Sequence, residues 1–484
     1  MALFDRKTMA DDVPVQSETG PQAEASAEKG NAGAKTSQSK RQVLPTYNHN
    51  GHLVSKWIQA EGESGRSGLQ PTSLFKLVWQ SSSTASSYTN VLWPFVPAAI
   101  ALHFVDGDHH VWTFAINYIA MVPAANLLGY AGQELARKLP KVAGILIETC
   151  LGSVVEIVLL MVLVAKDKAG AEVGHGNLTN VIQAAILGSI LTNLLLCLGG
   201  CFLVGGIRHK EQKFHAVVSE TGSGILLVAG FSLLIPSAFY SALSGSTTDT
   251  AVEGEATYTM ARLRADTLTI SHGVACILVV AFGTFIVYNA VSHDNIFNEV
   301  LEADEEMDRD RHKDLRKAKL TLTECLIAIS LALVIVSLIA VFLVEEIEFI
   351  VEQKHIPDNF VPLVEKAAEH LTTIDEAYDN MINSALFHCI GPSIQTALFN
   401  GPLAVIVSWG LGKSLNLNFE IFMVVLLVLS ILVVGNFLRD GSSNWLEGAL
   451  LLIVYAIIAL TTWYYPNAEM TTSNGSVGNA SGGE

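Results

Sequence analysis

The chain has 484 residues, of which 50% are hydrophobic and only 15% are charged. A soluble domain usually carries about 25% charged residues, so this composition indicates a membrane protein and argues against a soluble enzyme or binding domain. The net charge of −17 at pH 7 argues against a nucleic-acid partner, which would require a basic surface.

The start of the chain differs in composition from the rest. Residues 1–87 are rich in Ser, Gln, Ala, Gly and Lys and contain little apolar clustering. Such a segment buries too little apolar surface to fold, so we predict a disordered tail. It lacks the apolar core of a signal peptide. A second disordered tail is predicted at residues 467–484.

Between these tails the sequence predicts an all-α polytopic membrane protein with eleven transmembrane helices. The helices need enough apolar residues to cross about 30 Å of hydrocarbon. The eighth is the least apolar, because several charged residues interrupt it. The predicted spans are residues 90–105, 112–131, 141–165, 180–206, 217–243, 267–291, 320–345, 361–382, 384–410, 420–437 and 445–464.

Lysine and arginine are concentrated in three short connecting segments. They lie at 136–141, 208–213 and 310–319, after the second, fourth and sixth predicted spans. Positively charged loops remain in the cytosol, so these loops and the N-terminus are predicted to be cytosolic.

Two parts of the chain repeat one pattern. Residues 150–156 end in a glutamate and are followed by a span with Gln183 and a Gly-Ser pair at 188–189. Residues 365–370 contain a second glutamate and are followed by Gly-Pro-Ser-Ile-Gln at 391–395. An odd number of spans separates the two units, so they enter the membrane from opposite sides. This arrangement predicts an inverted repeat with a shared ion site near the middle of the bilayer.

Several colinear segments resemble one known family. The clearest are LGSILTNLLLCLGGCFLVGGIRHKEQKF at 187–214 and LRDGSSNWLEGALLLIVYAIIALTTWYYP at 438–466. They are similar to the calcium/proton exchangers of the calcium:cation antiporter superfamily, which are found on vacuolar membranes. The resemblance implies an extra first helix (88–107) and two five-helix inverted repeats (108–298 and 320–466). An acidic cytosolic linker (299–319) would join the repeats.

The signature motifs of that family are altered in this chain. The family pattern Gly-Asn-x-x-Glu reads Gly152-Ser153-Val-Val-Glu156 here. The pattern Gly-Asn-Ala-Ala-Glu-His reads Glu365-Lys366-Ala-Ala-Glu369-His370. Both glutamates and the histidine are present, and both asparagines are replaced. Glu148 stands where the family has a further asparagine.

The candidate site consists of groups that could hold a hard cation and protons. An ionised carboxylate at the centre of a membrane helix costs roughly 2.5–3.5 kcal/mol, so it is expected to be functional or paired. Ca²⁺ prefers several oxygen ligands. Burial favours the protonated form of a carboxyl group and a bound cation favours the ionised form, so cation and proton would compete. The expected cation and proton ligands are Glu156, Glu369, Gly152, Ser153, Gln183, Ser189, Ser393, Gln395 and His370, with the two glutamates as the metal ligands.

Three further charged residues are expected to modulate this site. Lys366 is either a tethered counter-ion near Glu369 or a side chain that reaches the solvent. Glu148 is either an added ligand or a partner of Lys366, and Glu365 is an extra acid that offsets this lysine. Asp375, Glu376 and Asp379 are expected to line a water-filled vestibule.

Other acidic residues and the cysteines have simpler interpretations. The linker is either a solvated loop or a segment that gathers cations. The six cysteines lie in apolar segments without zinc-site spacing, and we interpret them as small buried side chains. The acidic residues of the linker are Glu302, Asp304, Glu305, Glu306, Asp308 and Asp310.

The sequence therefore predicts a secondary antiporter that exchanges a cation, foremost Ca²⁺, for H⁺ across a vacuolar or similar endomembrane. No enzyme motif or ATP-binding motif was found, so no enzymatic activity and no cofactor are expected. The expected partners are an inorganic cation, protons and the lipid bilayer, and homo-oligomerisation is left open. Two alternatives remain: a Na⁺ or K⁺/H⁺ antiporter of the same fold, and a transport-inactive relative that senses cations or pH.

Overall fold

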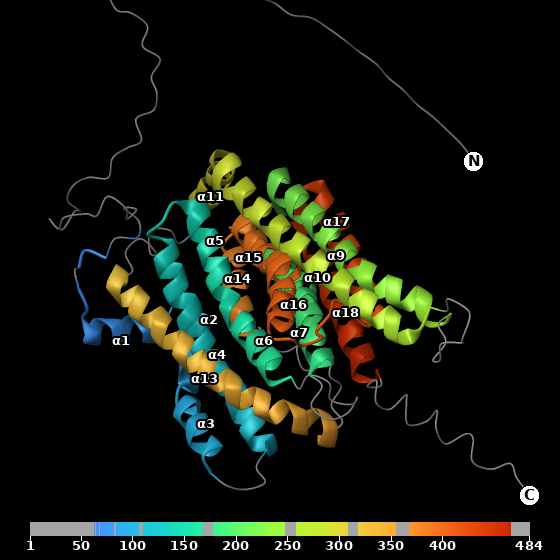
Figure 1. The fold of residues 1–484 in the computed structure, drawn as a ribbon. Coiled ribbons are helices and arrows are strands. Elements are labelled where there is room, and N and C mark those ends of the chain that lie inside the picture. The colour runs from blue at the N-terminus through green and yellow to red at the C-terminus, as the bar shows by residue number, and fades with distance from the viewer. Residues whose placement is uncertain are drawn as a thin grey trace, which may run out of the picture. The chain divides into compact units, whose positions relative to one another are not determined.

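The computed structural model describes residues 62, 64–66, 68–81, 84–105, 110–167, 178–246, 258–307, 318–354 and 367–465. These residues are almost entirely helical (Figure 1). The exception is a short antiparallel pair of strands, β1 (Glu211–Lys213) and β2 (Ser442–Asn444). The pair joins the end of α8 (Leu198–His209) to the start of α18 (Trp445–Trp463), with Gln212 opposite Ser443.

Within the described residues, nine helical segments are long and apolar enough to cross a membrane. Most of the eleven predicted spans are therefore found. The segments are α4 (His110–Ala136), α5–α6 (Lys141–Lys166), α7–η3–α8 (Thr179–His209), α9 (Ala216–Ser244), α10–η4 (Met260–Ser292), α13 (Leu322–Glu346 of the helix Leu322–Lys354), α15–η6–α16 (Ile382–Gly410), α17–η7 (Ile421–Asp440) and α18 (Trp445–Trp463).

The first and eighth predicted spans are not among these nine segments. The first contains η2 (Asn90–Leu92) and α3 (Phe95–His103), and the described part of the eighth contains α14 (Ala367–Tyr378). The structure therefore does not confirm the count of eleven.

Several membrane segments are interrupted at defined positions. The segment 141–166 breaks at Ser153, between α5 (Lys141–Gly152) and α6 (Val154–Lys166). The segments 179–209 and 382–410 each contain one π-helical turn, η3 (Thr192–Cys197) and η6 (Thr396–Asn400). These two turns follow the Gly-Ser and Pro-Ser elements of the two repeated patterns. π turns are rare and often occur at functional sites.

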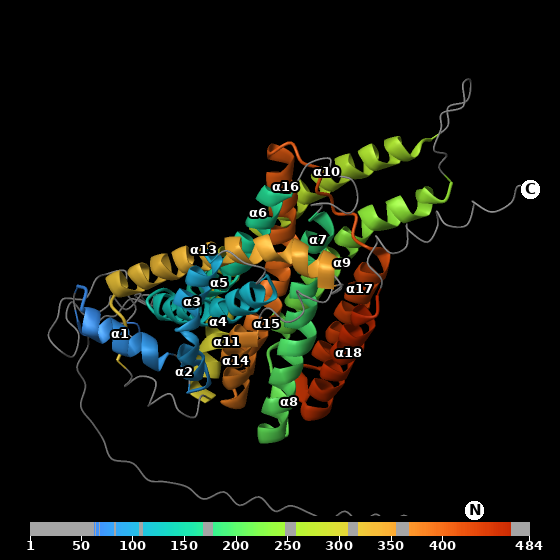
Figure 2. The same ribbon diagram turned by 90° about the horizontal axis from the view of Figure 1, so that it is seen from below.

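The helices pack in long pairs. Helix α13 crosses α4, α8 lies along α18, and α9 lies along α17 (Figures 1 and 2). The segments 179–209 and 382–410 lie at the centre of this arrangement and are the most buried of the nine. Leu191, Leu194 and Leu195 on the first segment are fully buried, which explains why its apolar residues are not confined to one helix face.

Part of the predicted N-terminal tail is folded. Residues 71–80 form α1 (Pro71–Gln80) and residues 84–89 form α2 (Thr84–Thr89), so the predicted disorder up to residue 87 was wrong for this stretch. Leu77 packs in a small buried cluster with Tyr130, Leu320 and Cys325. The Asn90 side chain donates hydrogen bonds to the carbonyls of Val78 and Trp79, which attaches α1 to the helices that follow.

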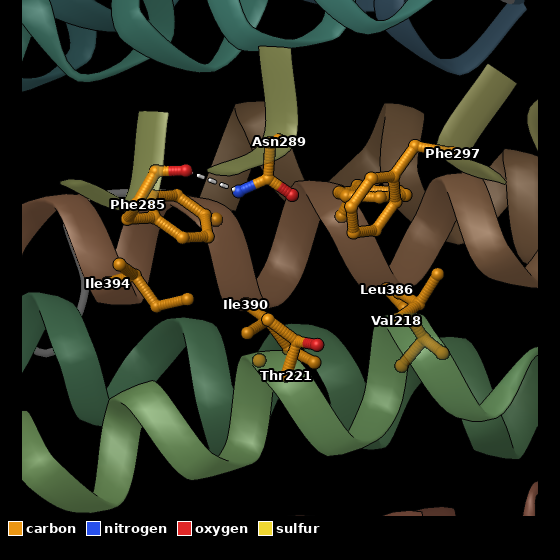
Figure 3. Close-up of a pocket in the computed structure, with 11 residues that line it drawn as sticks. Val218, Thr221, Phe285, Asn289, Phe297, Leu386, Ile390 and Ile394 are labelled. Carbon is orange, nitrogen blue, oxygen red and sulfur yellow. Dashed lines mark hydrogen bonds between the residues drawn. The ribbon is translucent and has the colours of Figure 1, made fainter. Parts of the chain in front are cut away.

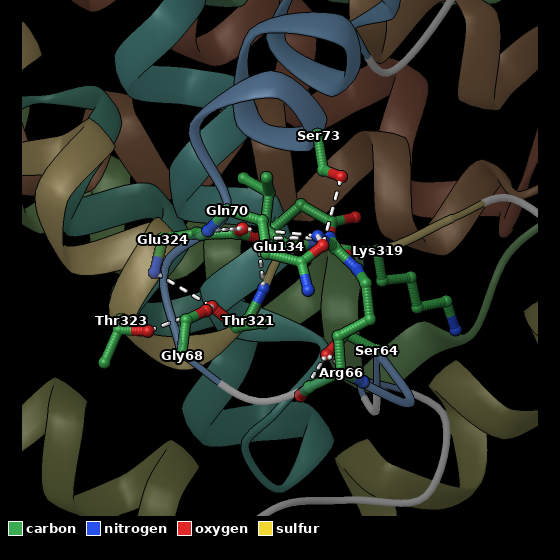
Figure 4. A network of polar contacts seen from close by, with 12 residues as sticks. Ser64, Arg66, Gly68, Gln70, Ser73, Glu134, Lys319, Thr321, Thr323 and Glu324 are labelled. Atoms are coloured by element: carbon green, nitrogen blue, oxygen red, sulfur yellow. Dashed lines mark hydrogen bonds and ion pairs between the residues drawn. The ribbon is translucent and has the colours of Figure 1, made fainter. Parts of the chain in front are cut away.

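A polar network fixes the segment before α1 against the start of α13 (Figure 4). Arg66 donates to both carboxylate oxygens of the fully buried Glu324 and, at 2.8 Å, to the carbonyl of Lys319. Lys138 donates to the carbonyls of Gly62 and Leu320 at 2.5 and 2.7 Å. Burial lowers the pKa of Lys138 from its ordinary value.

Candidate functional site

Glu156 is buried at the centre of the helical bundle. It lies in the first turn of α6, immediately after the break at Ser153, and only 3% of its surface is exposed. Ser189 in α7 (Thr179–Leu191) donates a hydrogen bond to Oε2 at 3.1 Å. Thr396, the first residue of η6, places its Oγ1 at 3.0 Å from both Oε1 and Oε2. Hydroxyl groups from both parts of the chain therefore surround one carboxylate.

The contact with Thr396 is supported by a further side chain. Asn400 donates from Nδ2 to Thr396 Oγ1 at 3.3 Å, and both residues are fully buried. The threonine oxygen accepts this hydrogen bond, so its single hydrogen remains available for one Glu156 oxygen at a time. The start of α6 also favours a negative charge at this position, because a helix N-terminus carries a partial positive charge.

Three buried oxygens in the sequence neighbourhood of Glu156 and Thr396 have no hydrogen-bond partner within the described residues. They are Ser153 Oγ, Gln395 Oε1 and Asn400 Oδ1. Gly152 has open space beside its Cα, since an added Cβ would meet no atom within 4 Å. A buried oxygen without a partner is costly unless a ligand or water completes it. This arrangement can therefore accept a cation.

Two other expected ligands have different neighbours. Gln183 donates from Nε2 to the main-chain and side-chain oxygens of Asn416 at 3.0 and 3.1 Å. It therefore connects α7 to the segment before α17 (Ile421–Phe437). Ser393 is fully buried and donates to the carbonyl of Cys389, one turn earlier in α15 (Ile382–Gln395).

The second signature motif is described only in part. Glu365 and Lys366, and the side chain of Glu369, lie outside the described residues, so their expected roles remain predictions. His370 in α14 is buried, and its Nε2 lies 3.0 Å from Oδ1 of Asn193 in η3. A residue of the second motif thus reaches the π turn of the first part of the chain, just as Thr396 reaches α6.

Glu148 takes part in a separate polar cluster. His388 in α15 places Nδ1 at 2.8 Å from Oε2 of Glu376 and Nε2 at 3.7 Å from Oε1 of Glu148. These three side chains are only 14 to 17% exposed. The described contact of Glu148 is therefore with His388, and Glu376 faces a histidine in a partly buried cluster.

The acidic linker does not form a uniform charged surface. Asp304 in α11 (Asp294–Met307) is 1% exposed and accepts hydrogen bonds from Asn383 Nδ2 at 2.7 Å and Ser384 N at 2.9 Å. It thereby caps the N-terminus of α15, so at this residue the linker is not a solvated loop. Glu302 and Glu306 are exposed. The side chain of Glu305 and the whole of Asp308 and Asp310 lie outside the described residues.

An apolar pocket lies apart from these carboxylates. It opens between α9, α10, η4, α11 and α15, with Val218, Ile390 and Phe297 on its walls (Figure 3). The Asn289 side chain at the pocket donates to the carbonyl of Phe285 at 2.8 Å. The residues that line this pocket include no carboxylate, so it does not supply ligands for a cation.

Sequence reasoning missed Thr396, although a signal for it exists. The pattern Ser-Ile-x-Thr occurs at 189–192 and again at 393–396. Each threonine begins a π turn, and each serine lies three residues before it.

The fold and the site together define a polytopic membrane protein with a buried carboxylate between two interrupted helical segments. The profile of the family described as sodium/calcium exchanger protein matches residues 109–291 and 325–464. The chain belongs to this family. The resemblance to calcium/proton exchangers found in the sequence is confirmed.

Individual relatives agree with this assignment. The vacuolar calcium ion transporter of Schizosaccharomyces pombe is 31% identical over 401 residues, which cover 81% of this chain and 89% of that protein. The vacuolar cation/proton exchanger 5 of Arabidopsis thaliana is 31% identical over 387 residues, with 77% and 80% covered.

Solved structures show the same fold. Native YfkE superimposes with a TM-score of 0.58 at 24% identity, over 78% of this chain and 100% of that one. A structure described as the H⁺/Ca²⁺ exchanger CAX has a TM-score of 0.53 at 14% identity, over 82% and 92%.

Proposed function

We propose that this chain is a secondary antiporter that exchanges Ca²⁺ for H⁺ across a vacuolar membrane. The observation that carries this proposal is the buried carboxylate of Glu156, held by hydroxyl groups from two distant membrane segments. The names of the relatives, vacuolar calcium ion transporter and vacuolar cation/proton exchanger, support the choice of ions and of membrane.

The geometry around Glu156 suits one site that holds either a cation or a proton. When the carboxylate is ionised, its two oxygens bind Ca²⁺, and the hydroxyl groups of Ser189 and Thr396 rotate so that their lone pairs face the ion. Ser153 is close to Glu156 in sequence, and Gln395 and Asn400 are close to Thr396. Their buried oxygens, which have no hydrogen-bond partner within the described residues, supply further ligands. When Glu156 is protonated, it loses its charge and donates a hydrogen bond instead. Bound Ca²⁺ and a proton on Glu156 therefore exclude each other, as antiport requires.

We extend the site to Glu369 through the repeat. Glu156 contacts the serine of its own half and the threonine of the other half. If the two halves form an inverted repeat, Glu369 contacts Ser393 and Thr192 in the same way. Thr192 is buried and begins η3, as Thr396 begins η6. In this arrangement α3 and α14 occupy the places of the first and eighth spans.

The N-terminus is placed in the cytosol by the same proposal. The basic residues Arg208 and His209 end α8, Lys138 lies between α4 and α5, and Lys141 is the first residue of α5. These positions follow an even number of predicted spans, so positive loops on the cytosolic side require a cytosolic N-terminus.

Ion flux into proteoliposomes tests this function directly. The purified full-length chain is reconstituted, a pH gradient is imposed, and the uptake of Ca²⁺, Mn²⁺, Na⁺ and K⁺ is compared. The proposal predicts Ca²⁺ uptake that depends on the gradient and stops when a protonophore removes it. Uptake of Na⁺ or K⁺ without Ca²⁺ would support the monovalent antiporter, and no uptake of any ion would support the transport-inactive relative.

A further inference from the structure

Three cysteines from distant parts of the chain meet at the centre of the bundle. Cys197 ends η3, Cys201 lies one turn later in α8, and Cys389 lies in α15. All three are fully buried. The Sγ atom of Cys389 lies 3.3 Å from that of Cys197 and 3.9 Å from that of Cys201, and all three sulfurs lie within 4.8 Å of one another.

The sulfur–sulfur distances of 3.3 and 3.9 Å are near those of thiolates that share one metal ion. Zinc–sulfur bonds are about 2.3 Å long, so thiolates bound to one tetrahedral or trigonal ion lie roughly 3.7–4.0 Å apart. A disulfide requires sulfurs about 2.05 Å apart. In the described part of the chain, which includes all six cysteines, this is the one group of three His, Cys, Asp or Glu residues with ligand atoms this close.

The cluster is chemically different from the site at Glu156. Carboxylate, hydroxyl and amide oxygens suit hard cations such as Ca²⁺, whereas thiolates select soft ions such as Cd²⁺, Zn²⁺ and Cu⁺. The sequence spacing did not reveal the cluster, because one of its members comes from a different segment, 188 residues away from Cys201.

We propose that Cys197, Cys201 and Cys389 form a binding site for a thiophilic divalent ion, represented by Cd²⁺ or Zn²⁺. Binding converts three thiols into three thiolates, so it releases three protons for each ion bound. This binding does not depend on the proposed exchange function. The cysteines belong to two segments, 179–209 and 382–410, so a bound ion links them. If the chain exchanges ions by moving these segments relative to each other, the occupied site stops exchange.

Cadmium binding to the purified full-length protein tests the site. We expect one Cd²⁺ per chain, an ultraviolet cadmium–thiolate absorption band, and an X-ray absorption spectrum with three sulfur neighbours. Excess Ca²⁺ should leave the band unchanged, because oxygen-preferring ions do not compete for thiolates. Absence of sulfur neighbours in the wild-type protein, or loss of the band on addition of Ca²⁺, would overturn the proposal without any variant.

Serine variants identify the ligands. Cys197→Ser, Cys201→Ser and Cys389→Ser should each lose the band and weaken Cd²⁺ binding by at least tenfold. Cys325→Ser, which changes a buried cysteine elsewhere, and Cys276→Ser, which changes an exposed one, should behave as the wild type. An unchanged band in any correctly eluting variant of the three would remove that residue from the site. A protein that binds no Cd²⁺ and contains a Cys197–Cys389 disulfide would contradict the metal site.

Flux measurements separate this proposal from the proposed function. Inhibition of Ca²⁺ uptake by Cd²⁺ should persist at saturating Ca²⁺ and disappear in Cys389→Ser. Inhibition that excess Ca²⁺ relieves equally in wild type and variant would show competition at Glu156 and would overturn the blocking effect. A protein that shows no exchange at all but has the sulfur-bound Cd²⁺ would refute the function and keep the metal site.

Discussion

Thr396 Oγ1 lies 3.0 Å from both carboxylate oxygens of Glu156, although the two residues are 240 positions apart in the chain. This contact joins the first turn of α6 to the π turn η6 in the second part of the chain. It makes the buried carboxylate the point at which two interrupted segments meet. A change of charge or ligand at Glu156 therefore alters a contact between the two segments.

Replacement of Thr396 tests that contact. Thr396→Val keeps the size of the side chain and removes the hydroxyl group, so Ca²⁺ loses one ligand and Glu156 loses one hydrogen bond. We expect an increase of about tenfold in the apparent KM for Ca²⁺, which corresponds to about 1.4 kcal/mol, because the bound ion loses one oxygen ligand. The matched control is Thr462→Val, because Thr462 is fully buried and donates to the carbonyl of Ile458 in its own helix. An equal increase in KM for both substitutions would mean that Thr396 has only a structural role.

The repeat predicts a mirrored pair of residues. Thr192→Val and Ser393→Ala should each reduce exchange, because both side chains are expected to contact Glu369. Ser430→Ala is the control for the serine: Ser430 is buried and donates to the carbonyl one turn earlier, as Ser393 does. Wild-type flux in both test variants would contradict the mirrored site and leave the site at Glu156 untouched.

Asp304 is predicted to stabilise the fold and not to gather cations. Asp304→Ala removes the acceptor for the Ser384 amide at the start of α15, which should lower the free energy of unfolding by about 1 kcal/mol or more. Glu306→Ala changes an exposed side chain of the same helix and should have no effect. Thermal unfolding in detergent measures both. An unchanged midpoint for Asp304→Ala, with a salt-dependent loss of Ca²⁺ affinity, would restore the interpretation as a cation-gathering residue.

Arg66 is predicted to hold the N-terminal segment in place. Arg66→Ala leaves the buried carboxylate of Glu324 without its positive partner, which should cost about 1.5–3 kcal/mol. The segment 64–81 should then become more sensitive to limited proteolysis. The exposed pair of Arg262 and Asp266 provides the control, and Arg262→Ala should change neither property. Similar proteolysis of both variants would show that Arg66 does not hold the segment.

The sequence predicted the positions of the nine long helices in the described residues well, because spanning segments must be apolar and about 20 residues long. It also identified Glu156, since an ionisable residue among apolar neighbours is conspicuous. The first and eighth spans stay predictions, because the described residues show η2 and α3 in the first and only α14 in the eighth.

The contacts between distant segments could not be predicted in the same way. Asp304 looked like one acid in an acidic run, and only the packing of α11 against α15 places it at a helix end. Glu148 and His388 are 240 residues apart, and neither has an unusual sequence neighbourhood. The prediction of buried cysteines was correct for Cys197, Cys201, Cys325 and Cys389, whereas Cys150 is partly buried and Cys276 is exposed.

The exchange of Ca²⁺ for H⁺ at Glu156 is tested most directly by Glu156→Gln in proteoliposomes. Glutamine has nearly the same shape but carries neither the charge that binds the cation nor the titratable proton. Glu306→Gln, which changes an exposed acid, is the control, and elution on size exclusion shows that each variant is folded. The account predicts that Glu156→Gln abolishes pH-driven Ca²⁺ uptake while the control retains it. Near-wild-type uptake by a folded Glu156→Gln protein would contradict the account.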